Sequence, residues 1–347
     1  MKTHKNLFTN IVAFENLWSA AQSAAQGKRE QPNVLHFFHK LEENLWRLQE
    51  ELACQSYRPG EYSTFHIYEP KPRMISAASF RDRVVHHALI NVIGPLFERS
   101  FIFDSYANRL GKGTHRAIRR FQHFLRDFRY CLKCDLRKYF PSIDHAILKA
   151  LIRRRVADGR TLWLIDAIID GSNLQEPLLT YFSGDDLFTP LQRRRGLPIG
   201  NLTSQFFANV YLNPLDHFVK EILLCLAYLR YVDDFVLFAN SKAELLAWQT
   251  YLSAFLEDYR LQLHTRRCYI FPTRRAASFL GQRILRTHRR LCAPNVRKFK
   301  HRLRAWHKRP PENLQQRLAS WVGHARQADT HRLLHSLSLH ELFPAHH

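Results

Sequence analysis

Residues 228–238 read YLRYVDDFVLF, so two runs of aromatic and branched apolar residues flank Asp233 and Asp234. Such runs are typical of β-strands, and the pattern predicts a hairpin with both carboxylates at its tip. Carboxylates beside buried strands cost folding free energy unless something neutralises them. A divalent cation, which prefers oxygen ligands, would do so. Aspartate is also common in ordinary turns, so this pair alone leaves both interpretations open.

A third carboxylate ends another predicted strand. Residues 130–135 read YCLKCD, an alternating pattern that finishes in Asp135, and Asp144 farther on is suited to cap a helix. A lone aspartate at such a place can equally be a cap or a turn residue. It becomes a natural metal ligand when a neighbouring strand brings a second acid alongside. Two ions held by carboxylates of adjacent strands can stabilise the attacking and leaving oxygens of a phosphoryl transfer.

The charge balance predicts a polyanionic partner. The 347 residues include 52 Lys+Arg and 30 Asp+Glu, a net charge of +22, while the hydrophobic fraction of 46% is that of a globular protein. Nucleic acid is the first expectation and an anionic membrane surface the second. No apolar run approaches the roughly 18 residues that span a bilayer, and the N-terminus lacks a signal-peptide core. We therefore expect a soluble, cytoplasmic protein with no membrane partner.

The six cysteines predict no disulfide framework. Cys131 and Cys134 form one C-x-x-C motif, but no second pair follows at the spacing of a zinc site. Residues three apart on a strand point to opposite faces. Both are therefore interpreted as buried structural cysteines.

Apolar spacing predicts the remaining elements. Asn201 and Thr203 are expected to cap the helix that follows them. Lys71 and Arg73 lie beside two prolines, and this basic group fits either a solvated face or a phosphate site. We expect helices over residues 7–25, 34–54, 80–97, 145–182 and those beyond Pro294, and strands over residues 65–68, 261–263 and 279–284, the last with a bend at Gly281.

In their order and spacing these motifs resemble those of reverse transcriptases, from about Phe65 to about Leu285. The resemblance rests on the YVDD box at 231–234, the block 135–140, the block 197–200 with Ser204, and the turn 279–281. It implies an α+β right-hand polymerase with fingers, a palm built on an antiparallel sheet, and a short helical thumb. The expected divisions are N-terminal helices 1–60, fingers 61–127, palm 128–285 with a helical insertion at about 146–195, and thumb 286–347.

The resemblance also implies roles for single residues. Asp135, Asp233 and Asp234 would be catalytic and would hold two Mg²⁺ ions, with Mn²⁺ as an alternative and the Leu136 carbonyl as a further ligand. Arg267 would act electrostatically at most, because arginine is a poor proton donor. The other expected residues are Lys71 and Arg73 on the triphosphate, Phe140 against a ribose 2′-OH, Ile199, Gly200 and Gln205 in the nucleotide pocket, Phe279, Leu280 and Gly281 in the primer grip, and Arg297, Lys298, Lys300 and Arg304 on nucleic acid.

A finer resemblance is to the enzymes of diversity-generating retroelements. Most reverse transcriptases have Gln where this chain has Ile199, and Ser-Pro where it has Ser204 and Gln205. Gln can hydrogen-bond the incoming nucleotide or its neighbours, whereas Ile can only pack, so discrimination should loosen. The resemblance implies a bacterial or phage-encoded enzyme that copies a template RNA with dNTPs into cDNA with errors at adenines. It would hold the RNA/cDNA duplex and work with a small basic accessory variability determinant that forms an oligomeric ring.

Three alternatives stay open. The first two are an antiphage-defence and a group II intron-type reverse transcriptase. The intron type is disfavoured by the little sequence after the expected thumb, which leaves no room for a maturase or endonuclease domain. The third is a non-catalytic RNA-binding scaffold, which is disfavoured because a scaffold has no reason to concentrate three acids in a basic protein.

Overall fold

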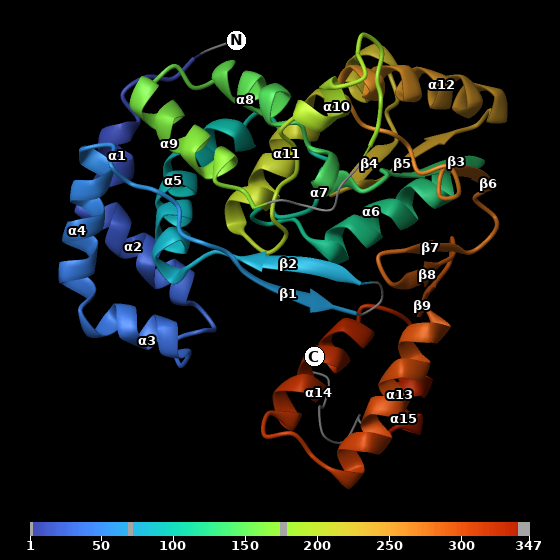
Figure 1. The fold of residues 1–347 in the computed structure, drawn as a ribbon. Helices are drawn as coiled ribbons and strands as arrows, with labels where there is room; N and C mark the ends of the chain where they lie inside the picture. Colours follow the sequence, from blue (N-terminus) through green and yellow to red (C-terminus); the bar gives the residue numbers. More distant parts are fainter. Residues whose placement is uncertain (1–2, 69–71, 174–178, 339–347) are drawn as a thin grey trace.

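The computed structural model describes residues 3–68, 72–173 and 179–338. It combines helices with antiparallel sheets (Figure 1). In the view of Figure 1 the N-terminal helices lie at the left, the four-stranded sheet lies at the right, and the helices α13 (Ala293–Lys308), α14 (Leu314–Ala325) and α15 (His331–Ser336) lie at the bottom. This is the mixed α+β class that the sequence predicts.

The N-terminal block contains more helices than the sequence predicts. The expected helices over 7–25 and 34–54 are each split in two, at Ala13 and at Lys40. Distant side chains bond the carbonyls at these breaks: Gln49 Nε2 donates to Val12 O (2.7 Å) and Asn44 Nδ2 to Phe37 O (2.9 Å). The helices are α1 (Phe8–Val12), α2 (Phe14–Ala25), α3 (Pro32–His39), α4 (Leu41–Ala53) and the long α5 (Phe80–Glu98), against which α2 packs.

The central sheet has the order β4-β5-β3-β6 and is antiparallel throughout. Its strands are β3 (Tyr130–Asp135), β4 (Tyr228–Tyr231), β5 (Asp234–Ala239) and β6 (Tyr269–Pro272). Both faces are buried, since Cys134 belongs to one apolar cluster and Cys131 to another on the opposite face. This confirms that both cysteines are buried, and all six cysteines are free thiols.

Helices cover both faces of this sheet. On one face lie α12 (Lys242–Asp258) and α11 (Leu202–His217), behind which α8 (His145–Arg153) packs on α11 and α9 (Gly159–Asp170) packs on α8. The other packs against α6 (Thr114–Asp127), whose Phe121 meets Phe238 edge-on with ring centroids 5.4 Å apart. The expected capping by Asp144 is confirmed, because its side chain accepts from Ile147 N at the start of α8 (3.1 Å).

Two expected elements in this region are wrong. The helix expected over 145–182 ends at Asp170, and the described residues 171–173 and 179–182 are not helical. The segment 261–263 forms a single bridge between Leu263 and Leu136 rather than a strand. It instead extends the sheet edge past Asp135, whose carbonyl accepts from His264 N (2.8 Å). The short elements nearby are α7 (Tyr139–Ser142), α10 (Thr189–Gln192) and the π-helix η1 (Phe218–Ile222).

A separate hairpin pairs β1 (Ser63–Ile67) with β2 (Arg73–Ala77) and extends away from the core (Figure 1). Its β1 residues are all exposed, so packing contributes little to holding it. The base of β2 is held by backbone bonding instead, because Ser76 N donates to Ile199 O (2.9 Å). Lys71 falls outside the described residues.

The C-terminal part contains a small sheet and a helical cluster. The bend expected at Gly281 is confirmed but is a full turn, because Leu280 (φ 45°) and Gly281 (φ 81°) reverse the chain, so residues 279–284 form a hairpin rather than one bent strand. Phe299 stacks on Trp321 with ring centroids 3.6 Å apart and centres the helical cluster. The elements are β7 (Ala277–Phe279), β8 (Gln282–Ile284), β9 (Arg289–Leu291), α13 (Ala293–Lys308), α14 (Leu314–Ala325) and α15 (His331–Ser336).

The described helices include none with the length and apolar character needed to cross a lipid bilayer.

A buried ion pair joins α11 to the central sheet. Arg230, on β4, and Asp216, on α11, are both 0% exposed. Arg230 Nε and Nη2 donate to the two oxygens of Asp216 (2.7 and 2.6 Å), and Tyr228 OH donates to the same carboxylate (2.7 Å). Arg230 Nη1 donates to Asn209 Oδ1 (3.1 Å) and to Val232 O (3.0 Å). The guanidinium therefore binds the turn between β4 and β5 through the Val232 carbonyl.

Asp216→Asn should lower the free energy of unfolding by about 3–5 kcal/mol, because it leaves a buried guanidinium without its counter-charge. Urea unfolding measures this loss. The matched control is Asp170→Asn, whose carboxylate pairs with Lys149 at the surface (2.6 Å) and should contribute about 1 kcal/mol or less. Equal losses in the two variants would contradict the account.

Candidate active site

The register of the central sheet brings the three predicted carboxylates together. Asp135, the last residue of β3, lies directly opposite Asp234, the first residue of β5. Asp233 occupies the two-residue turn between β4 and β5. The other turn residue, Val232, has φ 57°, which is unfavourable for a β-branched side chain and persists only where surrounding contacts hold it. The hydrogen bond from buried Arg230 to Val232 O is such a contact.

Burial and mutual repulsion raise the proton affinity of these carboxylates. Burial raises the pKa of Asp233 to about 6, with further contributions from the charges of Asp234 and Asp135. Burial, followed by the Asp234 charge, also raises the pKa of Asp135. Burial raises the pKa of Asp234, opposed by the Lys133 ammonium. A bound cation would relieve this repulsion.

Three basic side chains partly balance the acids. Arg267 Nη1 donates to Asp135 Oδ2 (2.6 Å). Arg267 is therefore close enough to the carboxylates for the electrostatic role expected of it. The charge of Arg73, at the start of β2, lowers the pKa of both Asp135 and Asp233, which places Arg73 on the same side as the carboxylates. Lys133 Nζ lies 4.0 Å from Asp234 Oδ1. Sequence reasoning missed Lys133; a lysine inside an otherwise apolar strand was the available signal.

The donors at this site suit a hard cation. They are carboxylate oxygens, with the Leu136 backbone next to them, and such oxygens are the ligands of Mg²⁺ and Mn²⁺. Among residues 3–68, 72–173 and 179–338, no three histidine, cysteine or acidic side chains are grouped closely enough to hold an ion by themselves. Mg²⁺ is commonly held by one or two carboxylates together with substrate phosphates and water. The residues therefore fit a cation whose remaining ligands arrive with the substrate.

Backbone hydrogen bonds hold the segments that carry the predicted pocket residues Phe140, Ile199 and Gly200. Leu197 N donates to Phe140 O (3.0 Å), and Ile199 O accepts from Ser76 N of β2. Gly200 has φ 120°, and a Cβ there would come within 3.0 Å of Ile75 Cγ2. Glycine is therefore required both by the backbone and by the close approach of β2. Gln205 is half-buried in the first turn of α11.

Asn201 has a role that sequence reasoning missed. Its side chain makes no capping bond to α11 among the described residues, so the expected cap is wrong. The amide instead binds β2: Oδ1 accepts from Ala78 N (3.0 Å) and Nδ2 donates to Ser76 O (2.8 Å). This buried amide satisfies the hydrogen-bonding groups Ala78 N–H and Ser76 C=O, which lie outside α11. Thr203 is buried within the first turn of α11.

The expected primer-grip residues form the turn between β7 and β8. Phe279 is buried and stacks on Phe121 of α6 with ring centroids 4.6 Å apart. Lys133 Nζ donates to Ser278 O (3.2 Å), which ties this hairpin to the strand that carries Asp135. The expected nucleic-acid residues all lie exposed on α13, whose buried residue is Phe299: Arg297, Lys298, Lys300 and Arg304.

Comparison with known proteins now identifies the family. The family described as "Reverse transcriptase (RNA-dependent DNA polymerase)" matches residues 68–284, which is more than half of the chain and includes all three carboxylates. The chain belongs to the reverse transcriptase family. It is therefore an enzyme of the RNA-directed DNA polymerase class, a class that uses divalent metal ions. Its helices and antiparallel sheets form the right-hand polymerase fold.

Its relatives include proteins of group II introns. Protein YkfC of Escherichia coli K12 is 26% identical over 293 residues, covering 72% of this chain and 74% of YkfC. The group II intron-encoded protein LtrA of Lactococcus lactis is 23% identical over 214 residues, covering 61% of this chain and 33% of LtrA. A telomerase structure from Candida albicans aligns with a TM-score of 0.44 and 12% identity, over 68% of this chain and 46% of that one. The chain thus spans about a third of LtrA and under half of the telomerase chain.

Asp233→Asn should stabilise the metal-free reverse transcriptase at neutral pH. Because the folded pKa of about 6 exceeds the ordinary value of 3.8, the ionised group costs stability above pH 6, and this cost fades as pH falls toward 4. We expect a gain of about 1–3 kcal/mol at pH 7.5 that shrinks at pH 4.5. Urea unfolding in EDTA measures it. Glu30→Gln, at an exposed loop position, is the control, and a destabilised Asp233→Asn protein at pH 7.5 would contradict the electrostatic account.

Proposed function

We propose that this chain copies a template RNA into DNA by nucleotidyl transfer at the carboxylate centre, with two Mg²⁺ ions or, alternatively, Mn²⁺. The pairing of Asp135 with Asp234 across β3 and β5, with Asp233 in the adjoining turn, carries this proposal. Asp135, Asp233 and the Leu136 carbonyl would hold the ions, and Asp234 would assist. When bound, such ions supply charge stabilisation for the attacking and leaving oxygens of the displacement.

Residues of the chain itself would place the substrate. Arg73 lies where its charge acts on both Asp135 and Asp233, which suits a group that orients the triphosphate next to them. Phe140 borders the pocket wall and would exclude a ribose 2′-OH by its bulk. Arg267 holds Asp135 in the free protein and can release it when the substrate arrives. Lys71 is assigned to the triphosphate by its sequence position alone.

The larger divisions follow from these assignments. We propose residues 61–127 as fingers, 128–285 as palm and 286–347 as thumb, after N-terminal helices over 1–60. The exposed basic face of α13 would bind the RNA/cDNA duplex through its phosphates, so binding should weaken steeply as salt rises.

Asp233→Ala should reduce primer extension on an RNA template by at least about a thousandfold, since it removes a charge from the reacting centre. The binding of the RNA template, measured by filter retention, should change by less than about twofold, because phosphate contacts lie on other elements. Asp258→Asn, at the exposed end of α12, is the control. Extension that survives in the Asp233 variant would overturn the site assignment, and the non-catalytic scaffold would then be the better interpretation.

We propose further that the enzyme serves a diversity-generating retroelement in the cytoplasm of a bacterium, with a ring-forming accessory protein as partner. The support is the sequence of residues 199–205, in which Ile199 stands where most reverse transcriptases have Gln. Its backbone is fixed to Ser76, so its side chain has a defined place beside Gly200. An apolar side chain there cannot hydrogen-bond the nucleotide, and a lost polar contact weakens discrimination.

A second candidate is a group II intron-type reverse transcriptase, which the likeness to LtrA favours. The two candidates differ in fidelity and in template. The intron type predicts accurate copying of structured intron RNA, whereas the retroelement type predicts frequent errors at template adenines.

Ile199→Gln should lower misincorporation at template adenines by roughly tenfold, because it restores a hydrogen-bonding group to the pocket. Sequencing of cDNA made on a defined RNA measures the error rate at each base. Ile199→Leu, which keeps the pocket apolar, is the control and should leave the errors in place. Unchanged adenine errors in Ile199→Gln would refute the role of this residue, and a wild-type enzyme without adenine errors would favour the intron type.

A further inference from the structure

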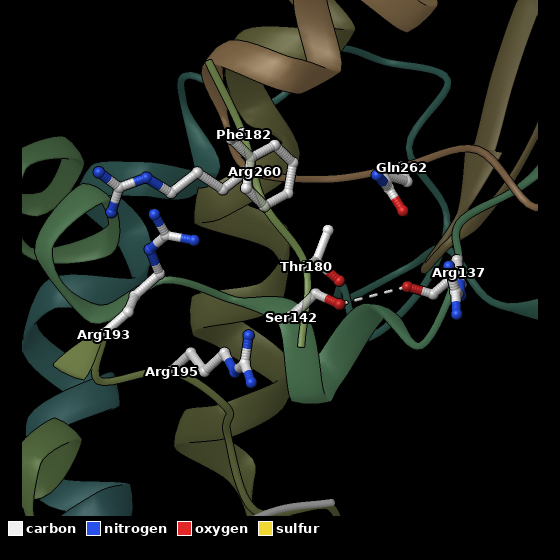
Figure 2. A pocket seen from close by; sticks show the side chains of 8 residues that line it. All are labelled: Arg137, Ser142, Thr180, Phe182, Arg193, Arg195, Arg260 and Gln262. Atoms are coloured by element: carbon white, nitrogen blue, oxygen red, sulfur yellow. Dashed lines mark hydrogen bonds between the residues drawn. The ribbon is translucent and has the colours of Figure 1, made fainter. Parts of the chain in front are cut away.

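A pocket outside the carboxylate centre is lined mainly by arginines (Figure 2). It lies among the segment after β3, the end of α7, the loop at 180–182, the residues after α10 and the segment after α12. Two of its residues are close in sequence to predicted active-site residues: Arg137 is two residues past Asp135, and Ser142 is two residues past Phe140. Its lining is Arg137, Ser142, Thr180, Phe182, Arg193, Arg195, Arg260 and Gln262, none of which has a proposed catalytic or nucleotide role.

The charges around this pocket do not balance. Four guanidinium groups face two carboxylates: Asp144 contacts both Arg193 and Arg260, and Asp185 contacts Arg193. Arg137 and Arg195 take part in none of the ion pairs found among the described residues. The pKa of Arg195 is lowered by burial and then by the Arg193 charge, as crowding of like charges requires. The pocket therefore keeps a net positive charge that an anion would neutralise.

Arg193 has N–H groups without a hydrogen-bond acceptor in the described part of the chain. Its side chain is 5% exposed, and its Nε and Nη1 have no hydrogen-bond acceptor among the described residues. Buried N–H groups almost always have an acceptor; within the residues that the structure describes, Nε has only a long ion-pair contact with Asp144 Oδ2 (3.6 Å), and Nη1 has no acceptor, so this guanidinium can accommodate a further acceptor. Figure 2 shows Arg193 and Arg260, which share Asp144, close together beside Phe182, with the hydroxyls of Ser142 and Thr180 toward the centre of the lining.

The size of the pocket limits the ligand. The enclosed space is about 20 Å³, which suits one small group and excludes a base or a sugar. Guanidinium groups bind oxyanions through paired, parallel N–H donors, and phosphate is one of the oxyanions that this geometry matches. The Ser142 hydroxyl already donates to Lys138 O (2.9 Å), but the Thr180 hydroxyl and the Gln262 amide in the lining can donate to the remaining oxygens of a phosphate.

We propose that this arginine pocket binds a single phosphate group at a site distinct from the carboxylate centre. The phosphate can come from a nucleic-acid backbone or from free phosphate and pyrophosphate, the latter being what nucleotidyl transfer releases. The chemistry of recognition is the same for both sources. The proposal stands on the pocket itself and does not depend on the function proposed above.

The test uses the full-length protein in EDTA, so that metal-dependent binding at the carboxylates is absent. Calorimetric titration with inorganic phosphate and with pyrophosphate should show saturable binding. The double variant Arg137→Met/Arg195→Met should weaken it by about tenfold or more, because it removes two charge-assisted donors without breaking the Asp144 pairs. The matched control Arg297→Met/Lys300→Met removes the same charge from α13 and should change binding by less than about twofold.

Arg195→Lys is the second variant, which keeps the charge and loses the paired donors, and it should give an intermediate loss. A competing abasic oligodeoxynucleotide distinguishes the sources. If it displaces pyrophosphate from the wild type and binds the double variant more weakly, the site takes a backbone phosphate; if it does not compete, the site takes the free anion. Absent saturable binding, or equal weakening by the pocket and α13 variants, would overturn the proposal.

Discussion

Repulsion among three carboxylates is the constraint on which the active site depends. The backbone hydrogen bonds between β3 and β5 hold Asp135 opposite Asp234 in spite of the repulsion between their charges. The turn before β5 adds Asp233. The fold sustains this arrangement by strong bonding elsewhere. Arg230, wholly buried and paired with Asp216, binds the carbonyl of Val232 in a backbone conformation that valine would otherwise avoid. The site therefore has an unfavourable charge pattern on a well-supported backbone, which suits a centre completed by cations and substrate.

Positive charge is arranged in layers around these acids. Arg267 bonds Asp135 directly, Lys133 links Asp234 to the β7–β8 hairpin, and Arg73 approaches from β2. The three belong to separate parts of the chain, so the charge that balances the acids comes from β2, from β3 and from the segment before β6. Farther out, the arginine pocket and the face of α13 extend the same sign of charge over surfaces that nucleic acid could follow. This distribution explains how a protein of net charge +22 can keep an acidic centre.

Much of the core of the site could be predicted because it depends on local patterns. The alternation in 130–135 and the two runs around Asp233 predict the strands, and the order of motifs predicts their pairing. What could not be predicted depends on distant partners. Asn201 suits a helix cap by its sequence, but the amide bonds β2, more than 120 residues away in the chain. At the break at Ala13, the Val12 carbonyl accepts from Gln49, 37 residues away, and no periodicity connects the two. The segment 261–263 meets the chain just past the end of β3, where only Leu136 pairs with Leu263, so its apolar alternation yields one bridge.

The central claim is that the fold holds these carboxylates together for a cation that substrate phosphates help to bind. The most direct measurement is the unfolding midpoint of the protein at pH 7.5 with a dNTP, recorded with and without Mg²⁺. The account predicts that Mg²⁺ raises the midpoint of the wild type and of Glu30→Gln, and that this rise is lost in Asp135→Asn and Asp233→Asn. An equal rise in all four proteins, or none in the wild type, would contradict it.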